Sequence, residues 1–392
     1  MRAKRVLLAW EQGAGFGHTT QLSRLGRRLM AAGNEVVAAV RYPQLSAPLA
    51  EAGIRVIQSP IWPPPPQRPE DAVPASATLS DSLGRAGLRD PASVRTVLKG
   101  WRAILDAEQP DLMVCDYAPL AAPAAQGRCA IMQAGTAYCL PPSDLEQMPV
   151  LHEIAPPVHR DADLLASVNS ALADEGMAQL PRIGALFAGD DVFVRTFPLI
   201  DPYADLRERQ AEGPILGAPF TRMRPGARGI FAYLHVQVAS RPDVMEALRA
   251  LGPELEIHIP GAAEGLTEPL RTAGVHVHAK PAQMADVLSR SRLVLHQGSA
   301  GIATEALLAG VPQVTLSVHG EHYLNGECLA AAGLSHNVPL FDPRVRVAVE
   351  TIRAMHADEE ALLMAEAAAR MHRAMLAEDP LDVLTRRCLA LL

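Results

Sequence analysis

The sequence predicts an α/β protein made of two doubly wound, Rossmann-like domains that face a cleft. Short apolar runs alternate with longer helical patterns along nearly all of the 392 residues. Two such blocks occur, and a segment rich in proline, glycine and charge separates them. Strands that alternate with helices of this size form parallel sheets with right-handed crossovers. The chain is also long enough to build two domains, each with its own core.

The first block predicts six strands with helices between them. The strands lie at residues 5–10, 35–40, 54–57, 112–116, 129–132 and 191–195, and the helices near 20–32, 44–52, 92–107, 118–126 and 160–176. A proline cluster at 60–74 fits neither a helix nor a central strand. We therefore expect a loop on the cleft side there.

The second block repeats the pattern with five predicted strands. These lie at residues 229–234, 255–259, 275–278, 293–296 and 313–316, with helices near 241–251, 265–273, 282–290, 300–309 and 323–332 and a helical tail from about 343. We place an N-terminal domain at 1–205, a linker at 206–228 and a C-terminal domain at 229–375. A helix at 376–392 remains, and it can pack back on the N-terminal domain.

Composition excludes several classes of protein. The formal charge of −7 argues against a general nucleic-acid binder, and 49% hydrophobic residues argue against disorder. The five cysteines form no CxxC pair, which is typical of a reducing compartment. The uncharged stretches contain prolines and fall short of a membrane span, which needs about 20 apolar residues. The N-terminal apolar run is too short for a signal peptide. We expect a cytoplasmic protein with no membrane span.

A glycine-rich loop follows the first strand and admits two interpretations. Glycines stand at 13, 15 and 17, and His18 comes directly after them, before a helix expected from about residue 20. One interpretation is a dinucleotide-binding turn, but the spacing is GxGxG rather than GxGxxG. Arg41, at the end of the second strand, fits only an NADP 2′-phosphate. The other interpretation makes His18 a proton acceptor held over the cleft at a helix N-terminus.

An acid lies at the same edge of the predicted sheet. Asp116 ends the fourth strand, so its carboxylate can accept the second ring N–H of His18 and fix the tautomer. It can also cap a helix that begins near Ala118. These two roles are compatible. The pair indicates a base without a covalent nucleophile, suited to removing the proton of an incoming hydroxyl.

The second block carries a strand, a small-residue turn and a helix, which together form an anion site. Backbone N–H groups of Ser299, Ala300 and Gly301 and the helix dipole can bind a diphosphate. His296 or Gln297 can add a side-chain donor next to Gly298. Glu305 can reach ribose hydroxyls one turn into the helix. No Walker A lysine is present, so this is not an ATPase loop.

The segment from His296 to Pro312 resembles the donor-binding motif of GT-B glycosyltransferases of family 1, the UDP-glycosyltransferase-like enzymes that include bacterial macrolide and flavonoid glycosyltransferases. Gly17-His18 matches this family's Gly-His, whose histidine is the catalytic base, and Asp116 matches its partner acid. Glu321-His322 stands where the family carries an Asp/Glu-Gln pair that holds the donor sugar.

Two departures from the family pattern matter. The spacing from His296 to Glu305 is one residue longer than usual, so either His296 or Gln297 is the phosphate ligand, and we favour His296. Histidine replaces the usual glutamine at position 322, which puts a glucose preference in doubt.

The resemblance implies an inverting, metal-independent transferase of specialised metabolism. It would move a sugar from a UDP- or dTDP-sugar to a hydroxyl or another nucleophile of a small, fairly hydrophobic acceptor, or of a lipid- or peptide-linked one. The nucleotide sugar is a co-substrate, and no further cofactor or metal is expected. We expect the acceptor in the N-terminal domain, near Gly15, Phe16, Gly17 and Tyr138, and a monomer or homodimer.

Three other interpretations stay open. A non-catalytic GT-B helper of a partner glycosyltransferase would be expected to have a damaged His–Asp pair, and both residues are present here. A nucleotide-sugar epimerase needs extra acids around the sugar, which the sequence does not reveal. The NADP oxidoreductase depends on Arg41. His276 and His278 point to one face of a strand, but the sequence offers no third metal ligand.

Overall fold

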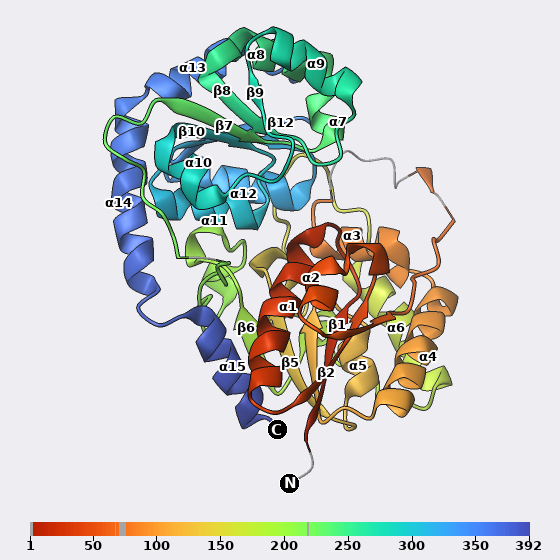
Figure 1. Cartoon of the computed structure of the whole chain (residues 1–392). Helices are drawn as coiled ribbons and strands as arrows, with labels where there is room; N and C mark the ends of the chain where they lie inside the picture. Colours follow the sequence, from red (N-terminus) through yellow and green to blue (C-terminus); the bar gives the residue numbers. More distant parts are fainter. Residues whose placement is uncertain (1–2, 67, 70–75, 218) are drawn as a thin grey trace. The chain divides into compact units, whose positions relative to one another are not determined.

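The computed structural model describes residues 3–66, 68–69, 76–217 and 219–392. The chain divides into two compact units: unit 1 comprises residues 1–215 and 378–392, and unit 2 comprises residues 216–377. Each unit contains one parallel sheet with helices packed against it (Figure 1). Within the proline cluster at 60–74, positions 67 and 70–74 lie outside the described residues.

Unit 1 has a six-stranded sheet among its described residues, in the order β3-β2-β1-β4-β5-β6. Its strands are β1 (Arg5–Trp10), β2 (Glu35–Val40), β3 (Arg55–Gln58), β4 (Leu112–Asp116), β5 (Ala130–Gly135) and β6 (Asp191–Val194). Its helices include α1 (Phe16–Ala31), α2 (Ala47–Glu51), α3 (Leu79–Leu83), α4 (Pro91–Glu108), α5 (Ala121–Ala125) and α6 (Asp161–Asp174). Because all neighbouring strands are parallel, the carboxyl ends of β1, β4 and β6 reach the same edge of the sheet.

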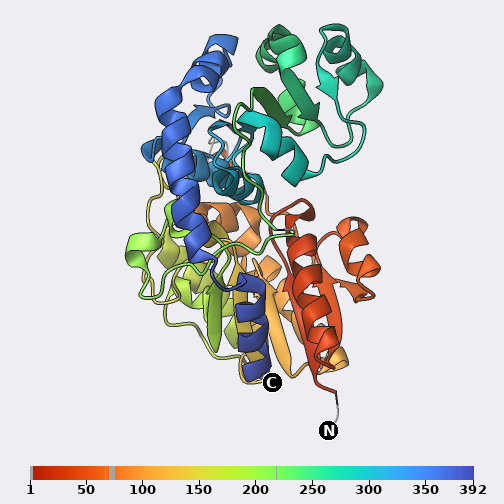
Figure 2. The same ribbon diagram turned by 60° about the vertical axis from the view of Figure 1, so that its left-hand side comes forward.

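The C-terminal helix α15 (Pro380–Ala390) belongs to unit 1. Its apolar face, with Leu381, Leu384 and Cys388, is part of the core that β1 and α1 also line. Arg387 binds Asp191 at the start of β6 and Glu212. Figure 2 shows α15 beside the sheet of unit 1, next to the C-terminus. The last residues of the chain therefore complete the core of the first unit.

Unit 2 repeats the architecture with a six-stranded sheet among its described residues, in the order β12-β11-β10-β7-β8-β9. Its strands are β7 (Gly229–Tyr233), β8 (Leu255–His258), β9 (His276–Val277), β10 (Ser291–His296), β11 (Gln313–Ser317) and β12 (Ser335–Pro339). Its helices include α7 (Val236–Ala239), α8 (Pro242–Leu251), α9 (Glu264–Thr272), α10 (Met284–Arg290), α11 (Ala300–Ala309), α12 (Gly320–Ala331), α13 (Val349–Ala357) and α14 (Glu359–Met375). The apolar side chains of β7, β8 and β10 form its main core.

The two parallel sheets confirm the predicted fold class, and all eleven predicted strands are present. Strand β12 is not among the predicted strands, because its residues, Ser-His-Asn-Val-Pro, give no apolar run. Several helix starts also differ by three or four residues: α1 begins at Phe16 rather than near 20, α2 at Ala47 rather than near 44, α5 at Ala121 rather than near 118, and α12 at Gly320 rather than near 323. Among the described residues, no helix combines the length and apolarity that a membrane crossing requires.

Candidate active site

Glycines shape the loop between β1 and α1 around the ring of His18. Gly13 and Gly15 have φ angles of 86° and 87°, a region that favours glycine. A Cβ added at Gly13 would lie 2.6 Å from Nε2 of His18. Since α1 begins at Phe16 with Gly15 as its N-cap, His18 lies inside the first helical turn. The glycine loop therefore makes room for an imidazole.

The imidazole of His18 has a defined orientation. It stacks on the buried indole of Trp10, with ring centroids 4.9 Å apart and an interplanar angle of 17°. Its Nδ1 lies 3.1 Å from Oδ2 of Asp116, and the side chain is 15% exposed. With Nδ1 beside a carboxylate, Nε2 is the nitrogen left to accept a proton from a substrate.

Asp116 reaches His18 because β1 and β4 are paired neighbours. Trp10 and Asp116, the last residues of the two strands, are partners in the parallel register. The carboxylate of Asp116 is fully buried. It caps no helix, since the N-cap of α5 is Leu120, so the capping role considered from the sequence is wrong. The structure thus places the carboxylate of Asp116 beside the imidazole of His18.

Arg195 joins this pair and was missed in the sequence analysis. It follows the last residue of β6, and its Nη2 lies 2.8 Å from Oδ1 of Asp116, with the side chain 6% exposed. Burial alone would raise the pKa of Asp116, but the adjacent Arg195 and His18 outweigh it and lower this pKa below its usual value. The signal was available in principle, because position 195 ends a predicted strand at the same sheet edge.

A second buried carboxylate holds the loop that follows β1. Glu11 is buried, and its side chain accepts hydrogen bonds from the indole N–H of Trp101 and from the backbone N–H of Leu120, the latter at 2.8 Å. Burial raises the pKa of Glu11 to about 7. The backbone N–H of Gln12 also donates to the carbonyl of Tyr117 at 2.9 Å. These bonds tie the loop after β1 to the loop after β4.

The geometry of unit 1 opposes a dinucleotide-binding turn. Arg41, considered as a ligand of an NADP 2′-phosphate, donates instead to the side-chain oxygen of Gln12 and to the carbonyl of Glu11, the latter at 3.4 Å. The ring of His18 fills the space above Gly13 that a diphosphate would need. The His18 interpretation therefore accounts for the loop better than the NADP interpretation.

The residues expected to contact an acceptor differ in exposure. Gly15 and Gly17 are exposed, and Phe16 between them is 55% exposed, an unusual state for a large apolar side chain beside a catalytic candidate. Tyr138 is instead nearly buried in the 3-10 turn at Ala137–Cys139, with its hydroxyl 3.1 Å from Oγ of Ser82. Phe16 is therefore an exposed apolar side chain two residues before His18, whereas Tyr138 has little surface accessible to an acceptor.

In unit 2, the turn between β10 and α11 is held by a close approach to α12. Gly298 has a φ of 93°, and an added Cβ would overlap the backbone carbonyl oxygen of His322. The side-chain amide of Asn325 donates to the carbonyl of Gly298 at 2.8 Å. Ser299 is the N-cap of α11, and Ala300 and Gly301 open the helix. The backbone N–H groups of this first turn form a helix N-terminus able to bind an anion.

His296 and Gln297 both have internal partners. Nε2 of His296 lies 2.7 Å from Oε1 of Gln313, and its Nδ1 accepts the N–H of Gly298 at 3.0 Å. His296 is fully buried, and burial lowers its pKa to about 4. Oε1 of Gln297 accepts the backbone N–H of His235 at 2.9 Å. Both ring nitrogens of His296 therefore bind protein atoms, which argues against the favoured assignment of His296 as phosphate ligand.

The residues expected to hold sugars lie on α11 and α12. Glu305 and Glu321 are partly exposed. His322 is buried, and its ring stacks on that of His319 with centroids 3.7 Å apart. Among the described residues, its Nδ1 has no hydrogen-bond partner. Burial first, and the neighbouring histidines second, lower the pKa of His322, so the ring is neutral near pH 7.

Comparisons with known proteins agree with the fold. No protein-family model matches the chain. It is 27% identical to the L-demethylnoviosyl transferase of Streptomyces niveus over 339 residues, which is 83% of each protein. The structure of the calicheamicin glycosyltransferase CalG4 matches with a TM-score of 0.70 and 17% identity, covering 100% of this chain and 98% of CalG4.

The spinosyn rhamnosyltransferase SpnG matches with a TM-score of 0.68 and 17% identity, covering 99% of this chain and 100% of SpnG. SpnG has been solved with thymidine diphosphate and with the spinosyn aglycone. These enzymes share the architecture of two Rossmann-like domains, and the Streptomyces relative is a sugar transferase. The chain therefore has the GT-B fold, and it is similar in sequence and structure to bacterial glycosyltransferases.

Proposed function

We propose that this chain is an inverting glycosyltransferase that moves a sugar from a UDP- or dTDP-sugar to a hydroxyl of a small, fairly hydrophobic acceptor in specialised metabolism. The observation that carries the proposal is the alignment of His18, Asp116 and Arg195, with distances of 3.1 and 2.8 Å between successive partners. This arrangement orients a base and offers no covalent nucleophile. It therefore supports direct displacement by the acceptor.

The reaction begins with proton transfer to His18. Nε2 of His18 takes the proton of the acceptor hydroxyl while that oxygen attacks the anomeric carbon. The bond between the anomeric carbon and the diphosphate oxygen breaks on the opposite face, so the configuration inverts. Asp116 stabilises the imidazolium that forms, and Arg195 keeps Asp116 ionised. General-base catalysis of this kind contributes a factor of about 10²–10⁴ to the rate.

The leaving diphosphate takes up charge at the N-terminus of α11. Backbone N–H groups of Ser299, Ala300 and Gly301 would donate to it, and the helix dipole adds to this attraction. Because His296 is occupied internally, its role becomes the support of Gly298 in the turn. With charge compensation from the helix end, we propose that the transfer needs no metal at the reacting atoms. An activity that survives chelation with EDTA supports this.

Contacts to the rest of the donor are proposed from the family resemblance. Glu305 would bind the ribose, and Glu321 with His322 would bind hydroxyls of the sugar. Nδ1 of His322 has no partner among the described residues, which supports an assignment to a ligand. A neutral imidazole can donate or accept at that atom, whereas the glutamine amide usual at this position presents a separate donor and acceptor. The sugar it selects can therefore differ from glucose.

The acceptor proposal depends on Phe16 and on the relatives. Phe16 presents its ring to solvent two residues before the proposed base. An apolar aglycone can cover it and bring a hydroxyl to Nε2 of His18. SpnG has been solved in complex with the spinosyn aglycone, and CalG4 is named the calicheamicin glycosyltransferase. A hydroxylated, largely apolar small molecule fits this pattern.

A thermal-shift titration of the full chain with UDP, dTDP, GDP and NADP⁺ tests the proposal. A ligand at one hundred times its Kd stabilises the native state by about 2.7 kcal/mol, which raises Tm by a few degrees. Stabilisation by UDP or dTDP, followed by transfer from the matching nucleotide sugar to an apolar hydroxylated acceptor, supports the proposal. Stabilisation by NADP⁺ alone contradicts it. No shift with any nucleotide favours a non-catalytic helper.

A further inference from the structure

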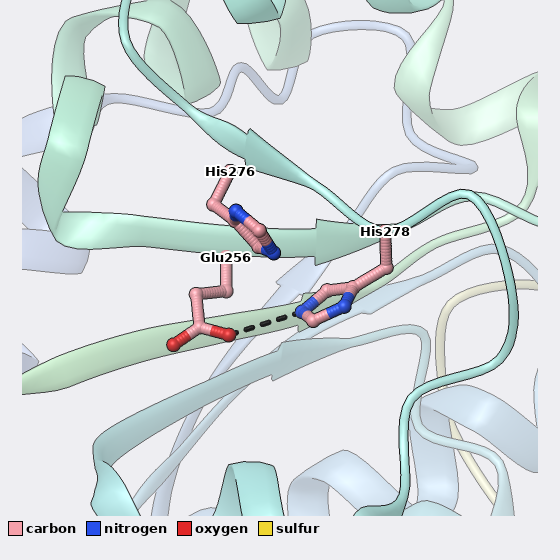
Figure 3. A group of neighbouring side chains, drawn as sticks. All are labelled: Glu256, His276 and His278. Carbon is pink, nitrogen blue, oxygen red and sulfur yellow. Dashed lines mark hydrogen bonds and ion pairs between the residues drawn. The ribbon is translucent and has the colours of Figure 1, made fainter.

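Two histidines and a carboxylate lie together at the edge of the unit 2 sheet, on strands that do not carry the phosphate loop. Glu256 on β8 and His276 on β9 are partners in the parallel register. His278 comes two residues after His276 and so points to the same face of the sheet. Figure 3 shows the three side chains next to one another on this face. The sequence suggested the histidine pair, and the strand register supplies the third ligand.

The distances within this group suit a small metal ion. Nε2 of His278 lies 3.0 Å from Oε2 of Glu256, and one ligand atom from each of the three residues lies within 4.8 Å of the others. Tetrahedral zinc with bonds of about 2.1 Å places its ligand atoms about 3.4 Å apart. His276 is exposed, so its ring can turn inward without disturbing the core. We propose that Glu256, His276 and His278 bind a divalent transition metal, with zinc as the occupant.

A neighbouring side chain already orients one of the ligands, and another contacts the backbone of a second. Arg290 donates to both oxygens of Glu256, at 2.8 and 2.7 Å. These two bonds fix the orientation of the Glu256 carboxylate. Nδ1 of His258 lies 3.2 Å from the carbonyl oxygen of His278. Such support around metal ligands fixes their geometry and raises affinity.

The charge of Arg290 opposes a cation, but it is partly compensated. Arg290 also binds the carboxylate of Asp286 at 2.5 Å, so the local charge without metal is close to balanced. Each oxygen of Glu256 keeps lone pairs beyond the bonds to Arg290. Two imidazoles with one carboxylate favour zinc and its neighbours in the first transition series over magnesium or calcium, which prefer oxygen ligands.

The metal would cross-link β9 to β8. β9 has only two residues in the ladder and is the edge strand of its sheet, so it has few bonds of its own. Ligands on both strands would add a link between them and couple metal binding to the stability of unit 2. This role is separate from sugar transfer, and the proposal holds whether or not the chain is a transferase.

Titration of untagged, EDTA-treated full-length protein with Co²⁺ tests the site, because a polyhistidine tag would itself bind the ion. We expect one equivalent to bind with the intense visible absorption of tetrahedral cobalt, and Zn²⁺ to displace it. At one hundred times its Kd, Zn²⁺ should raise Tm by a few degrees. Failure to bind, or only the weak absorption of octahedral cobalt, overturns the proposal.

Variants separate this site from adventitious binding. His276→Ala should lower Co²⁺ affinity at least about tenfold, and His278→Gln should do the same. His336→Ala removes an exposed histidine of β12 outside the cluster and should leave affinity unchanged. His276 is exposed, so its loss should not disturb folding, and Tm in EDTA checks this. Unchanged affinity in His276→Ala shows that the metal binds elsewhere and overturns the proposal.

Discussion

Replacing Arg195 by methionine tests whether the buried carboxylate of Asp116 needs its cationic partner. Nη2 and Oδ1 lie 2.8 Å apart, and both side chains are almost fully buried. At that distance, with an effective dielectric constant of 20, two unit charges attract by about 6 kcal/mol. The variant loses this attraction and keeps the cost of burying the carboxylate. Breaking a buried pair in this way typically costs about 3–5 kcal/mol of unfolding free energy.

The same variant should also change how activity depends on pH. In the native protein Arg195 and His18 outweigh burial and lower the pKa of Asp116. The ionised carboxylate therefore stabilises the fold at any pH above its unfolded pKa, and this stabilisation is lost as pH falls through its folded pKa. Without Arg195 burial prevails, and the pKa rises. Asp116 then takes up a proton at higher pH, and kcat falls on the acidic side at a pH where the wild type is still active.

Urea denaturation and a pH profile of kcat measure these two effects. Arg195→Lys keeps a charge and should recover part of both. Arg387→Met is the matched control, because it breaks an ion pair of Asp191 at the opposite end of β6. It should lower stability and leave the pH profile unchanged. A loss of less than about 1 kcal/mol in Arg195→Met, with the wild-type pH profile, would refute the reasoning.

Three further substitutions or conditions test other parts of the account. Gly13→Ala places a Cβ 2.6 Å from Nε2 of His18 and should lower kcat at least tenfold, which is about 1.4 kcal/mol or more. Gly33→Ala is the control, because Gly33 has a similar φ of 88° but open space around the added Cβ, so this variant should lose stability alone. Gly298→Ala drives a Cβ into the backbone of α12, so it should destabilise the protein by about 1–3 kcal/mol and weaken the stabilisation by the donor nucleotide in a thermal-shift assay. The pKa of His296 is lowered to about 4 in the fold, so the folded state binds fewer protons than the unfolded chain between pH 6.5 and 4. Unfolding free energy should therefore fall by about 3 kcal/mol as pH drops across this window, and His296→Asn should remove that slope in urea titrations.

Strand ends were predictable from the sequence, and with them the pair His18 and Asp116. Apolar runs locate β1 and β4, and both residues stand at the carboxyl edge where parallel sheets bind ligands. The partnership with Arg195 was not predictable in the same way. It requires the strand order β4-β5-β6, in which only β5 separates the end of β4, with Asp116, from the end of β6, next to Arg195. Apolar patterns in the sequence carry no information on the order of strands in a sheet.

Burial of polar side chains was the other source of error. His296 was expected to face a phosphate because it ends β10, but Gln313 on the neighbouring strand takes up its Nε2. Glu256 was not recognised as the third member of the cluster with His276, because only the register of β8 and β9 makes them neighbours. In both cases the missing information was a pairing across strands that are distant in sequence.

The central claim is that His18 removes the proton of the acceptor, and the turnover of His18→Ala with saturating substrates tests it most directly. The account predicts a fall in kcat of about 10²–10⁴-fold, with unchanged stabilisation by the donor nucleotide, because the proposed donor residues all lie in unit 2. A His18→Ala enzyme with a kcat within about threefold of the wild type, a loss below about 1 kcal/mol, would contradict it.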